Sequence, residues 1–278
     1  MVRPNAARNE AIQVVLIFLV LAVMMIPIFW MGSAAFKYSV DVYQLKLFFE
    51  PTLRNFVEIT EPPYLIQEKF LNSTIVATVT VALAIPLATL AAYGFSRFRL
   101  VGEKMMFVTI LATQFLPAVV IVLPFFIMFR DLGLLDTRLG LIIVDLALVM
   151  PFGIWMIKGF IDGIPIEIEE AAMIDGASRL QVIGRVILPL AAPGIVTAGI
   201  FCFIIAWNEF LFALTFLSTD SQRTVPVAIA LITGRSEFEI PWGNIMAASV
   251  IVTVPLVVLV LVFQRKIISG LTAGAVKG

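Results

Sequence analysis

The sequence contains no histidine and a single cysteine, Cys202. The lack of histidine excludes imidazole general-base catalysis and histidine-ligated metals, and one cysteine cannot build a disulfide framework or a cysteine-ligated metal site. Charge is also scarce, because only 14% of the 278 residues are charged and 19 Lys and Arg balance 19 Asp and Glu. A net charge of zero excludes the basic surface typical of nucleic-acid binding. The chain therefore has little obvious catalytic chemistry of its own.

Apolar residues dominate the chain. They make up 61% of it and give a mean hydropathy of +1.05, whereas soluble domains are about 45–50% apolar. So few polar residues cannot cover a soluble globular protein, and disorder is excluded too. Six stretches have the roughly 20 apolar residues that a bilayer-spanning helix needs: residues 11–31, 73–95, 105–129, 139–157, 194–217 and 245–263. Because they lack the period-two alternation of a membrane barrel, we expect an all-α membrane protein with six transmembrane helices in a single domain, 1–278.

The first stretch has two interpretations. Arg3 and Arg8 precede it, as basic residues precede the apolar core of a signal peptide. That core, however, is only about 7–15 residues long, and this stretch has 21 residues. We therefore expect a retained membrane helix.

The distribution of Lys and Arg predicts the orientation of the spans. With the N-terminus in the cytoplasm, the inside segments hold 11 of these residues and the outside segments hold 8. Basic residues favour the cytoplasmic side, so we expect both termini inside. This orientation places residues 32–72, 130–138 and 218–244 outside, and we expect short helices on the outer face within residues 32–72.

Segment 158–193, which this orientation places in the cytoplasm, is too polar to span and long for a connection. Pro165 suits the first turn of a helix, and Gly176 suits its end. Three glutamates lie in that first turn, where negative charge complements the positive helix end: Glu167, Glu169 and Glu170. Ser178 suits the N-cap of a second short helix over residues 179–186. We therefore expect two short helices with a break between them.

Such a helix pair either rests on lipid headgroups or docks onto a protein. Amphipathic helices that bind membranes are usually rich in Lys and Arg and carry bulky anchors. Here the first helix opens with three glutamates, which anionic lipid would repel. The composition therefore favours a protein partner.

One motif in this segment resembles the cytoplasmic EAA loop of ABC importer permeases. The resemblance is carried by Glu170-Ala171-Ala172, by Asp175-Gly176-Ala177 with its glycine six positions after Glu170, and by Leu188-Pro189. The family has Ile two residues before that Leu, where this sequence has Val186. A second match, Ala206-Trp207-Asn208-Glu209-Phe210, resembles the carbohydrate branch of these permeases. The likeness covers essentially the whole chain, and six spans with both termini inside resemble the maltose-type inner permease subunit.

The resemblance implies a subunit of a transport complex. In that family two permease subunits form the pore, two ATP-binding subunits lie beneath them, and an extracytoplasmic solute-binding protein delivers the sugar. The coupling helices, here residues 164–186 between the fourth and fifth spans, sit in a cleft of the ATP-binding subunit. ATP-driven closure of that pair rocks the permease between inward-facing and outward-facing states. The docking residues implied here are Glu170, Ala171, Ala172, Asp175 and Gly176, and Glu170 offers a carboxylate to an Arg or Lys of the partner.

The resemblance and the sequence agree that the energy source lies elsewhere. A Walker A sequence needs Gly-x-x-x-x-Gly-Lys-Ser/Thr, and no such run occurs. We therefore expect ATP and magnesium on the partner subunits, no cofactor in this chain, and no enzymatic activity of its own. The implied location is the cytoplasmic (inner) membrane of a bacterium or archaeon, where lipid and the partner subunits surround the chain.

Polar side chains inside a span are expensive and usually face a cavity or the helix bundle. Asn208 and Glu209 in the fifth span either line the sugar path, where hydroxyl groups need donors and acceptors, or fix helix packing through Glu209. Gln114 in the third span, near Pro117, either lines the path or makes an interhelical hydrogen bond. Asp145 in the fourth span either contacts the sugar or has a packing or gating role.

Other polar residues favour structural interpretations. Asn72 and Ser73 begin the second span and suit a helix cap, and Arg97 and Arg99 suit positive-inside anchors. The outer loop 218–244 either is solvated or meets the solute-binding protein. Its charged residues are the candidates for such a contact: Arg223, Arg235, Glu237 and Glu239.

Three other functions stay open at this point. A permease for another solute, such as glycerol phosphate, would call for a basic residue in the path, yet no span carries Lys or Arg. An ion-coupled secondary transporter often has intramembrane charge, which Asp145 and Glu209 supply, but the glutamate-rich cytoplasmic loop argues against it. A membrane enzyme would need a nucleophile–base pair or a metal cluster, and neither is evident. A neutral sugar carried by an ATP-driven importer is the preferred function.

Overall fold

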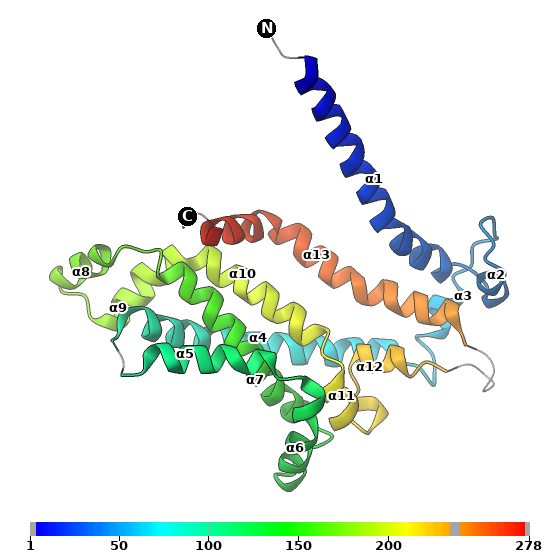
Figure 1. Cartoon of the computed structure of the whole chain (residues 1–278). Coiled ribbons are helices and arrows are strands. Elements are labelled where there is room, and N and C mark those ends of the chain that lie inside the picture. Colours follow the sequence, from blue (N-terminus) through cyan, green and yellow to red (C-terminus); the bar gives the residue numbers. More distant parts are fainter. Residues whose placement is uncertain (1–3, 100, 234–239, 276–278) are drawn as a thin grey trace. The chain divides into compact units, whose positions relative to one another are not determined.

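The computed structural model describes residues 4–99, 101–233 and 240–275, and every regular element in these ranges is helical (Figure 1). The chain forms two compact units. Unit 1 comprises Met1–Ile66 and Leu231–Val254, and unit 2 comprises Gln67–Ala230 and Pro255–Gly278. Within the described residues, five helices are long and apolar enough to cross a membrane, or six if one bent pair counts as a single span. This confirms the expected all-α membrane fold.

Unit 1 contains the long helix α1, Pro4–Ala35, the short helices α2, Ser39–Tyr43, and α3, Arg54–Glu58, and the first part of α13, Trp242–Ala275. α1 has 32 residues, far more than the apolar core of a signal peptide, and its stretch Ile12–Ala35 is a candidate span. The two short helices confirm that residues 32–72 contain short helical elements.

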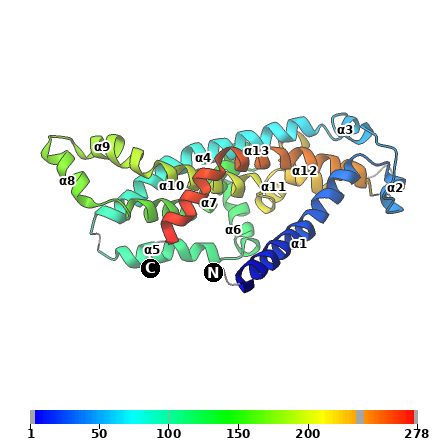
Figure 2. The same ribbon diagram turned by 90° about the horizontal axis from the view of Figure 1, so that it is seen from above.

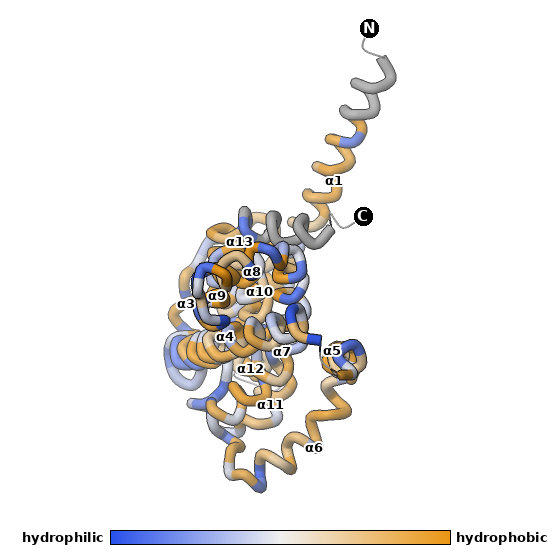
Figure 3. Tube along the Cα trace, turned by 90° about the vertical axis from the view of Figure 1, so that its left-hand side faces the viewer, coloured by the Kyte–Doolittle hydropathy of each residue, from blue (hydrophilic) through white to orange (hydrophobic). Residues whose placement is uncertain are grey.

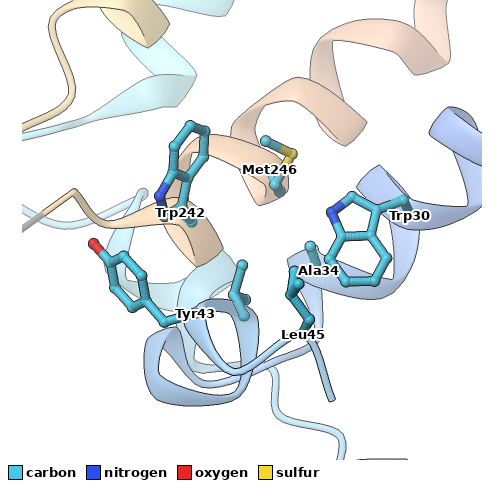
Figure 4. A pocket seen from close by; sticks show the side chains of 7 residues that line it. Trp30, Ala34, Tyr43, Leu45, Trp242 and Met246 are labelled. Atoms are coloured by element: carbon cyan, nitrogen blue, oxygen red, sulfur yellow. The ribbon is translucent and has the colours of Figure 1, made fainter. Parts of the chain in front are cut away.

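A pocket in unit 1 is lined mainly by apolar side chains from α1, α2 and the start of α13 (Figure 4). Trp30 and Trp242 contribute indole rings, Tyr43 a phenol ring, and Leu45 and Met246 aliphatic groups. The aromatic rings keep polar tips next to an apolar body, so the pocket surface is amphipathic.

Two buried polar side chains, Lys37 and Asn55, bind backbone carbonyls at the end of α1 and in the segment that follows it. Lys37 is 1% exposed; its Nζ lies 4.4 Å from the ring of Trp30 and 4.6 Å from the ring of Phe49, and it donates to the carbonyl of Lys46 at 2.8 Å. Asn55 Nδ2 donates to two carbonyls of this turn, each at 2.8 Å. Cation–π contacts and hydrogen bonds therefore compensate the burial of both groups.

The core of unit 2 consists of α4, Ile66–Arg97, α7, Arg138–Ile161, and α10, Leu188–Trp207 (Figures 1 and 2). Small residues let these helices approach closely. A Cβ added at Gly153 of α7 would lie 3.3 Å from the Cβ of Ala88 on α4 and 3.5 Å from Cys202 Sγ on α10. A Cβ at Gly194 of α10 would overlap the ring of Phe160 on α7. The three helices are thus packed without room for larger side chains at these points.

The predicted third span, residues 105–129, is broken. α5, Glu103–Ala112, continues through the 3-10 turn Thr113–Phe115, and α6, Ala118–Asp131, then starts in a direction 99° away. Leu116 is extended, because the ring of Pro117 disfavours helical backbone in the residue before it. Figure 3 shows that hydrophobic residues nevertheless dominate α6.

The predicted fifth span, residues 194–217, also breaks. α10 ends at Trp207, and the short helix α11, Leu211–Phe216, follows after three residues. At its other end α10 is continuous with α9, Arg179–Val182, through the π-helical turn Ile183–Ile187, so that Arg179–Trp207 is one candidate span. The prediction of a separate short helix over residues 179–186 is therefore wrong. The wide turn accommodates Pro189, which has no N–H to donate to the preceding turn.

The prediction that Asn72 and Ser73 cap a helix is also wrong. α4 already begins at Ile66, so both residues lie inside it. Instead, their side chains hold the chain that follows α11. Asn72 Nδ2 donates to the carbonyl of Ser221 at 2.8 Å, and Ser73 Oγ accepts from the N–H of Val225 at 2.9 Å. A cap binds the unpaired N–H groups of the first turn of a helix. Because α4 begins at Ile66, its first turn lies before Asn72 and Ser73.

That chain contains the 3-10 turn Asp220–Gln222 and leads into α12, Val225–Ala230. Lys69, 1% exposed, pairs with Asp220 Oδ2 at 2.5 Å. Among the charged outer-loop candidates, Arg223 pairs with Asp220 at 3.2 Å. The other three candidates lie outside the described residues: Arg235, Glu237 and Glu239.

The turn between α6 and α7 is tied to the same chain by Asp136. Its carboxylate accepts from the backbone N–H of Ser218 at 3.0 Å, from the N–H of Thr219 at 2.9 Å, and from the Thr219 hydroxyl. These hydrogen bonds, that of the Thr219 hydroxyl first, hold the pKa of Asp136 below its usual range, because they stabilise the charged carboxylate.

Candidate functional site

The loop between α7 and α10 begins with helix α8, Ile166–Ile174. Pro165 directly precedes the helix, and Gly176, just after its end, has a φ of +88°. Glycine adopts this left-handed conformation without steric cost, so the chain turns sharply there. Gln181 Oε1 accepts from the N–H of Ser178 at 2.8 Å, and Ser178 Oγ accepts from the N–H of Gln181 at 3.4 Å, a capping box. The predicted break at Gly176 and cap at Ser178 are confirmed.

The predicted docking residues lie on or directly after α8. Four of them are exposed, Glu170, Ala171, Asp175 and Gly176, and Ala172 is half-buried against the apolar core of unit 2. For the part of the chain that the structure describes, the Glu170 carboxylate has no intramolecular hydrogen-bond or ion-pair partner. This face of α8 therefore offers an uncompensated negative charge next to small side chains.

The neighbouring Glu169 points inward and is 2% exposed. Its Oε2 accepts from the hydroxyl of Tyr93 at 3.0 Å, and its Oε1 forms an ion pair with Nε of Arg97. Residues four apart on a helix share one face, so Tyr93 and Arg97 of α4 meet the carboxylate together. The sequence analysis missed this pair, because Arg97 suited a membrane anchor and Glu169 resembled the neighbouring glutamates. The only local signal for it is the four-residue spacing of Tyr93 and Arg97, which places both on one face of α4.

Arg97 also binds the end of α7. Its Nη2 donates to the carbonyls of Ile161 at 3.1 Å and Ile164 at 2.8 Å. The last carbonyls of a helix lack intrahelical partners and carry the negative end of the helix dipole, so a guanidinium complements them. Arg179, the first residue of α9, lies over the ring of Phe98 at 4.9 Å. Arginine contacts thus attach both α8 and α9 to the C-terminal end of α4.

The predicted path residues all lie at helix discontinuities. Gln114 is in the 3-10 turn that breaks the third span, and its Nε2 donates to the carbonyl of Leu148 on α7 at 3.1 Å, the interhelical hydrogen bond that was one of its two interpretations. Asn208 is exposed at the end of α10, where its Nδ2 donates to the carbonyl of Ile204 at 2.7 Å. Neither residue is therefore buried in a continuous span.

Glu209 is placed differently from the mid-span position that was predicted. It lies in the break between α10 and α11, and its two carboxylate oxygens accept from the N–H groups of Phe212 and Ala213, each at 2.8 Å. These are orphan donors in the first turn of α11, and the negative charge complements the positive end of that helix. Glu209 is thus a helix cap in this structure.

Asp145 is another polar residue of the predicted spans, and it lies within α7. It is 1% exposed, and among the described residues neither of its oxygens has a hydrogen-bond partner. Gln114 reaches α7 at Leu148, about one turn further along the same helix. Gln114 therefore bonds α7 about one turn from Asp145, whereas Glu209 caps α11 and Asn208 bonds back to its own helix.

Comparisons with known proteins agree with this architecture. The family model described as binding-protein-dependent transport system inner membrane component matches residues 84–272. The chain is 38% identical over 273 residues to the trehalose transport system permease protein SugB of Mycobacterium tuberculosis, covering 98% of this chain and 99% of the relative. It is 37% identical over 277 residues to the trehalose/maltose transport system permease protein MalG of Thermococcus litoralis, with coverage of 98% and 99%.

The fold is similar to that of solved transporter chains. A chain in the crystal structure of a bacterial ABC transporter that imports the acidic polysaccharide alginate matches with a TM-score of 0.80 at 24% identity, covering 95% of this chain and 98% of that one. A chain of the alginate transporter in complex with an alginate pentasaccharide-bound periplasmic protein matches with a TM-score of 0.70 at 16% identity, with coverage of 94% and 95%. At these identities the likeness concerns the fold.

Proposed function

The chain belongs to the family of binding-protein-dependent transport system inner membrane components, and from this premise we propose that it is a pore-forming permease subunit of an ATP-driven sugar importer. The observation that carries the proposal is the identity of 38% and 37%, over almost the full length, with permeases named for trehalose and maltose transport. The absence of Lys and Arg from all six predicted spans supports a neutral sugar as the solute, because an anionic solute would call for a basic residue in the path.

The exposed face of α8 is the proposed docking surface for an ATP-binding subunit. Glu170 presents its carboxylate to an Arg or Lys of the partner, a charge-assisted contact, while Ala171 and Ala172 let the partner approach closely. Asp175 and Gly176 form the turn that ends the helix. The rigid break at Gly176 and the capping box at Ser178 support a fixed two-part shape that fits a cleft.

The proposed complex contains this chain, a second permease subunit, two ATP-binding subunits and an extracytoplasmic solute-binding protein. ATP and magnesium are held by the ATP-binding subunits, and we assign no cofactor to this chain. The proposed location is the cytoplasmic (inner) membrane of a bacterium or archaeon, with both termini inside. The Lys and Arg distribution supports this orientation. α13 runs through both compact units, which supports a single permease domain over residues 1–278.

Asn208, Glu209 and Gln114 remain the proposed residues of the substrate path. Asn208 is the exposed member of the Asn208–Glu209 pair and ends a core helix. A helix break inside a membrane is tolerated where it lines a cavity or is buried in protein, and Gln114 marks the second such break. Side-chain amides supply both the donor and the acceptor that sugar hydroxyls need.

Affinity purification of the tagged chain from native membranes tests the complex. We expect a second permease, an ATP-binding subunit and a solute-binding protein to co-purify. The purified complex is then reconstituted in proteoliposomes, with ATP on the side of the membrane that carries the ATP-binding subunits. It is expected to transport a radiolabelled neutral disaccharide such as trehalose or maltose toward that side. A chain that purifies without any ATP-binding subunit would refute the importer and revive an ion-coupled transporter.

The docking surface is tested with Glu170→Ala and the matched control Asp162→Ala. Both changes remove one exposed carboxylate near the same loop, but Asp162 is already paired with Lys158 at 2.8 Å. We expect Glu170→Ala to lower retention of the ATP-binding subunit and ATP-dependent uptake by roughly tenfold, because a charge-assisted interface contact is lost. Equal retention and uptake in the two variants would contradict the assignment.

A further inference from the structure

The ion pair between Arg97 and Glu169 joins three elements at one point. Glu169 belongs to α8 and Arg97 to α4. Arg97 also binds the carbonyl of Ile161, the last residue of α7, and that of Ile164 in the turn after it. The two side chains are only 8% and 3% exposed, and Tyr93 of α4 donates to the same carboxylate at 3.0 Å. A single guanidinium therefore fixes the docking helix to two core helices.

Stability alone does not account for such a pair. The free energy lost when two charges are removed from water is similar to the free energy gained from their attraction. Apolar residues of similar volume therefore often stabilise a buried site at least as well. Tyr93, which contacts Glu169, belongs to a buried apolar cluster with Phe95, Ile157 and Ile187, so an apolar pair would also be compatible with this part of the core. The charged pair adds a fixed geometry, because the planar guanidinium donates its hydrogen bonds along fixed axes. It therefore defines one position of α8 relative to α4 and α7.

The chain path shows why this link matters for α4. α8 is joined to α7 by the short turn 162–165, and α9 is continuous with α10. α4 has no such connection, because α5, α6 and α7 separate it from the loop along the chain. The Arg97 contacts, the hydrogen bond from Tyr93 to Glu169 and Arg179 over Phe98 at 4.9 Å therefore tie the end of α4 to the loop.

We propose that Arg97 is a positioning residue for energy coupling: it holds α8 against the ends of α4 and α7, so that a displacement of the exposed face of α8 is passed to both core helices. This inference rests on the proposed function, in which an ATP-binding subunit supplies that displacement. Glu170 and Glu169 then have separate roles, since the first meets the partner and the second transfers the movement inward.

The test measures sugar uptake and ATP hydrolysis in the same proteoliposomes that contain the whole complex with its solute-binding protein. Arg97→Ala and Glu169→Gln are expected to lower the moles of sugar transported per mole of ATP by roughly tenfold, because each leaves a buried partner uncompensated and the loop unfixed. Arg97→Lys keeps the charge but not the planar fork and is expected to fall between. Arg99→Ala, which removes an exposed charge two residues away, is the matched control and is expected to keep the wild-type ratio.

A merely structural role predicts a different result. Uptake and hydrolysis would then fall together, in proportion to the amount of assembled complex, and their ratio would stay at the wild-type value; this outcome would overturn the inference alone. A wild-type complex without sugar-dependent ATP hydrolysis would overturn the proposed function, and the inference with it. The wild-type measurement therefore separates the two failures.

A cross-link between the two positions provides a rescue. The single cysteine of the chain, Cys202, is buried, so Arg97→Cys with Glu169→Cys in a Cys202→Ala background gives one reactive pair for a short bifunctional thiol reagent. Before cross-linking we expect the low ratio of Arg97→Ala, and after cross-linking we expect recovery toward the wild-type ratio. A cross-link that forms without restoring the ratio would overturn the positioning role.

Discussion

Replacing Glu209 separates its capping role from a role in the substrate path. The carboxylate accepts two backbone N–H groups, of Phe212 and Ala213, each at 2.8 Å. Those two residues are 1% and 0% exposed, so water cannot readily replace the lost acceptor. A hydrogen bond to a charged group contributes about 1.5–3 kcal/mol. Allowing for partial relaxation of the short helix, Glu209→Ala is expected to cost about 2–4 kcal/mol of the free energy of unfolding.

Thermal unfolding of the detergent-solubilised complex measures this cost. A loss of about 2–4 kcal/mol lowers the Tm by roughly 5–10 °C for a chain of this size. Glu209→Gln keeps one acceptor oxygen and is expected to lose about half as much. Asn208→Ala is the neighbouring control, because it removes a single hydrogen bond at the exposed end of α10 and is expected to cost below about 1 kcal/mol.

Uptake kinetics complete the comparison. If Glu209 acts chiefly as a cap, the KM for sugar changes little in Glu209→Gln, while Asn208→Ala raises it. A Glu209→Ala complex whose Tm stays within about 1 °C of wild type, a change worth only a few tenths of a kcal/mol, would refute the capping argument. A raised KM with an unchanged Tm would leave Glu209 with the substrate-path role alone.

Three further predictions follow from local geometry. The pKa of Asp136 is lowered on folding, so the charged carboxylate stabilises the folded state above the unfolded pKa, and this contribution is lost as the pH falls through the folded pKa. Acidification below about pH 4 is therefore expected to lower the Tm of wild type more than that of Asp136→Asn. Gly194→Ala is expected to cost about 1–3 kcal/mol through overlap with Phe160, whereas Gly199→Ala, whose nearest neighbour atom is 3.7 Å away, is expected to be nearly neutral in the same thermal assay. Ser178→Ala is expected to cost about 1 kcal/mol and to speed amide hydrogen exchange in α9; unchanged exchange there would contradict the capping box.

The features that the sequence predicted correctly are those that depend on neighbouring residues. The apolar runs over residues 11–31 and 245–263 lie within α1 and α13, because a long uncharged run has no stable alternative to a helix in lipid. The break at Gly176 and the cap at Ser178 are likewise local, since each depends on the conformational freedom or hydrogen bonding of one side chain.

The helix breaks inside apolar runs could not be located from hydropathy. Residues 105–129 and 194–217 are mostly apolar and carry no charge apart from Glu209, so their composition does not distinguish one helix from two. Proline in a span favours a kink, but Pro117 by itself does not predict a change of direction of 99°. Glu209 resembled a costly charge inside a helix, whereas at a break it satisfies backbone donors and its burial is compensated.

The contacts between distant residues were also beyond sequence reasoning. Arg97 and Glu169 are 72 positions apart, and the four-residue spacing of Tyr93 and Arg97 on α4 does not by itself identify Glu169 as their partner. Asn72 and Ser73 were assigned to a cap because they precede the apolar run, yet α4 begins at Ile66 and their side chains bind the chain after α11. In both cases the tertiary partner, rather than helix propensity, determines what the polar side chain does.

These contacts share one physical cause. Backbone groups freed at a helix end or break need partners, because lipid supplies none, and the chain has few polar side chains to provide them. Arg97 binds the last carbonyl of α7, Glu209 binds N–H groups in the first turn of α11, and Asp136 binds the N–H groups of the chain that follows α11. Asp145 is the exception, since it is buried in mid-helix and among the described residues bonds no backbone group. Burial of a carboxyl group without a hydrogen-bond partner costs free energy, so Asp145 does not share the structural role of the other three residues.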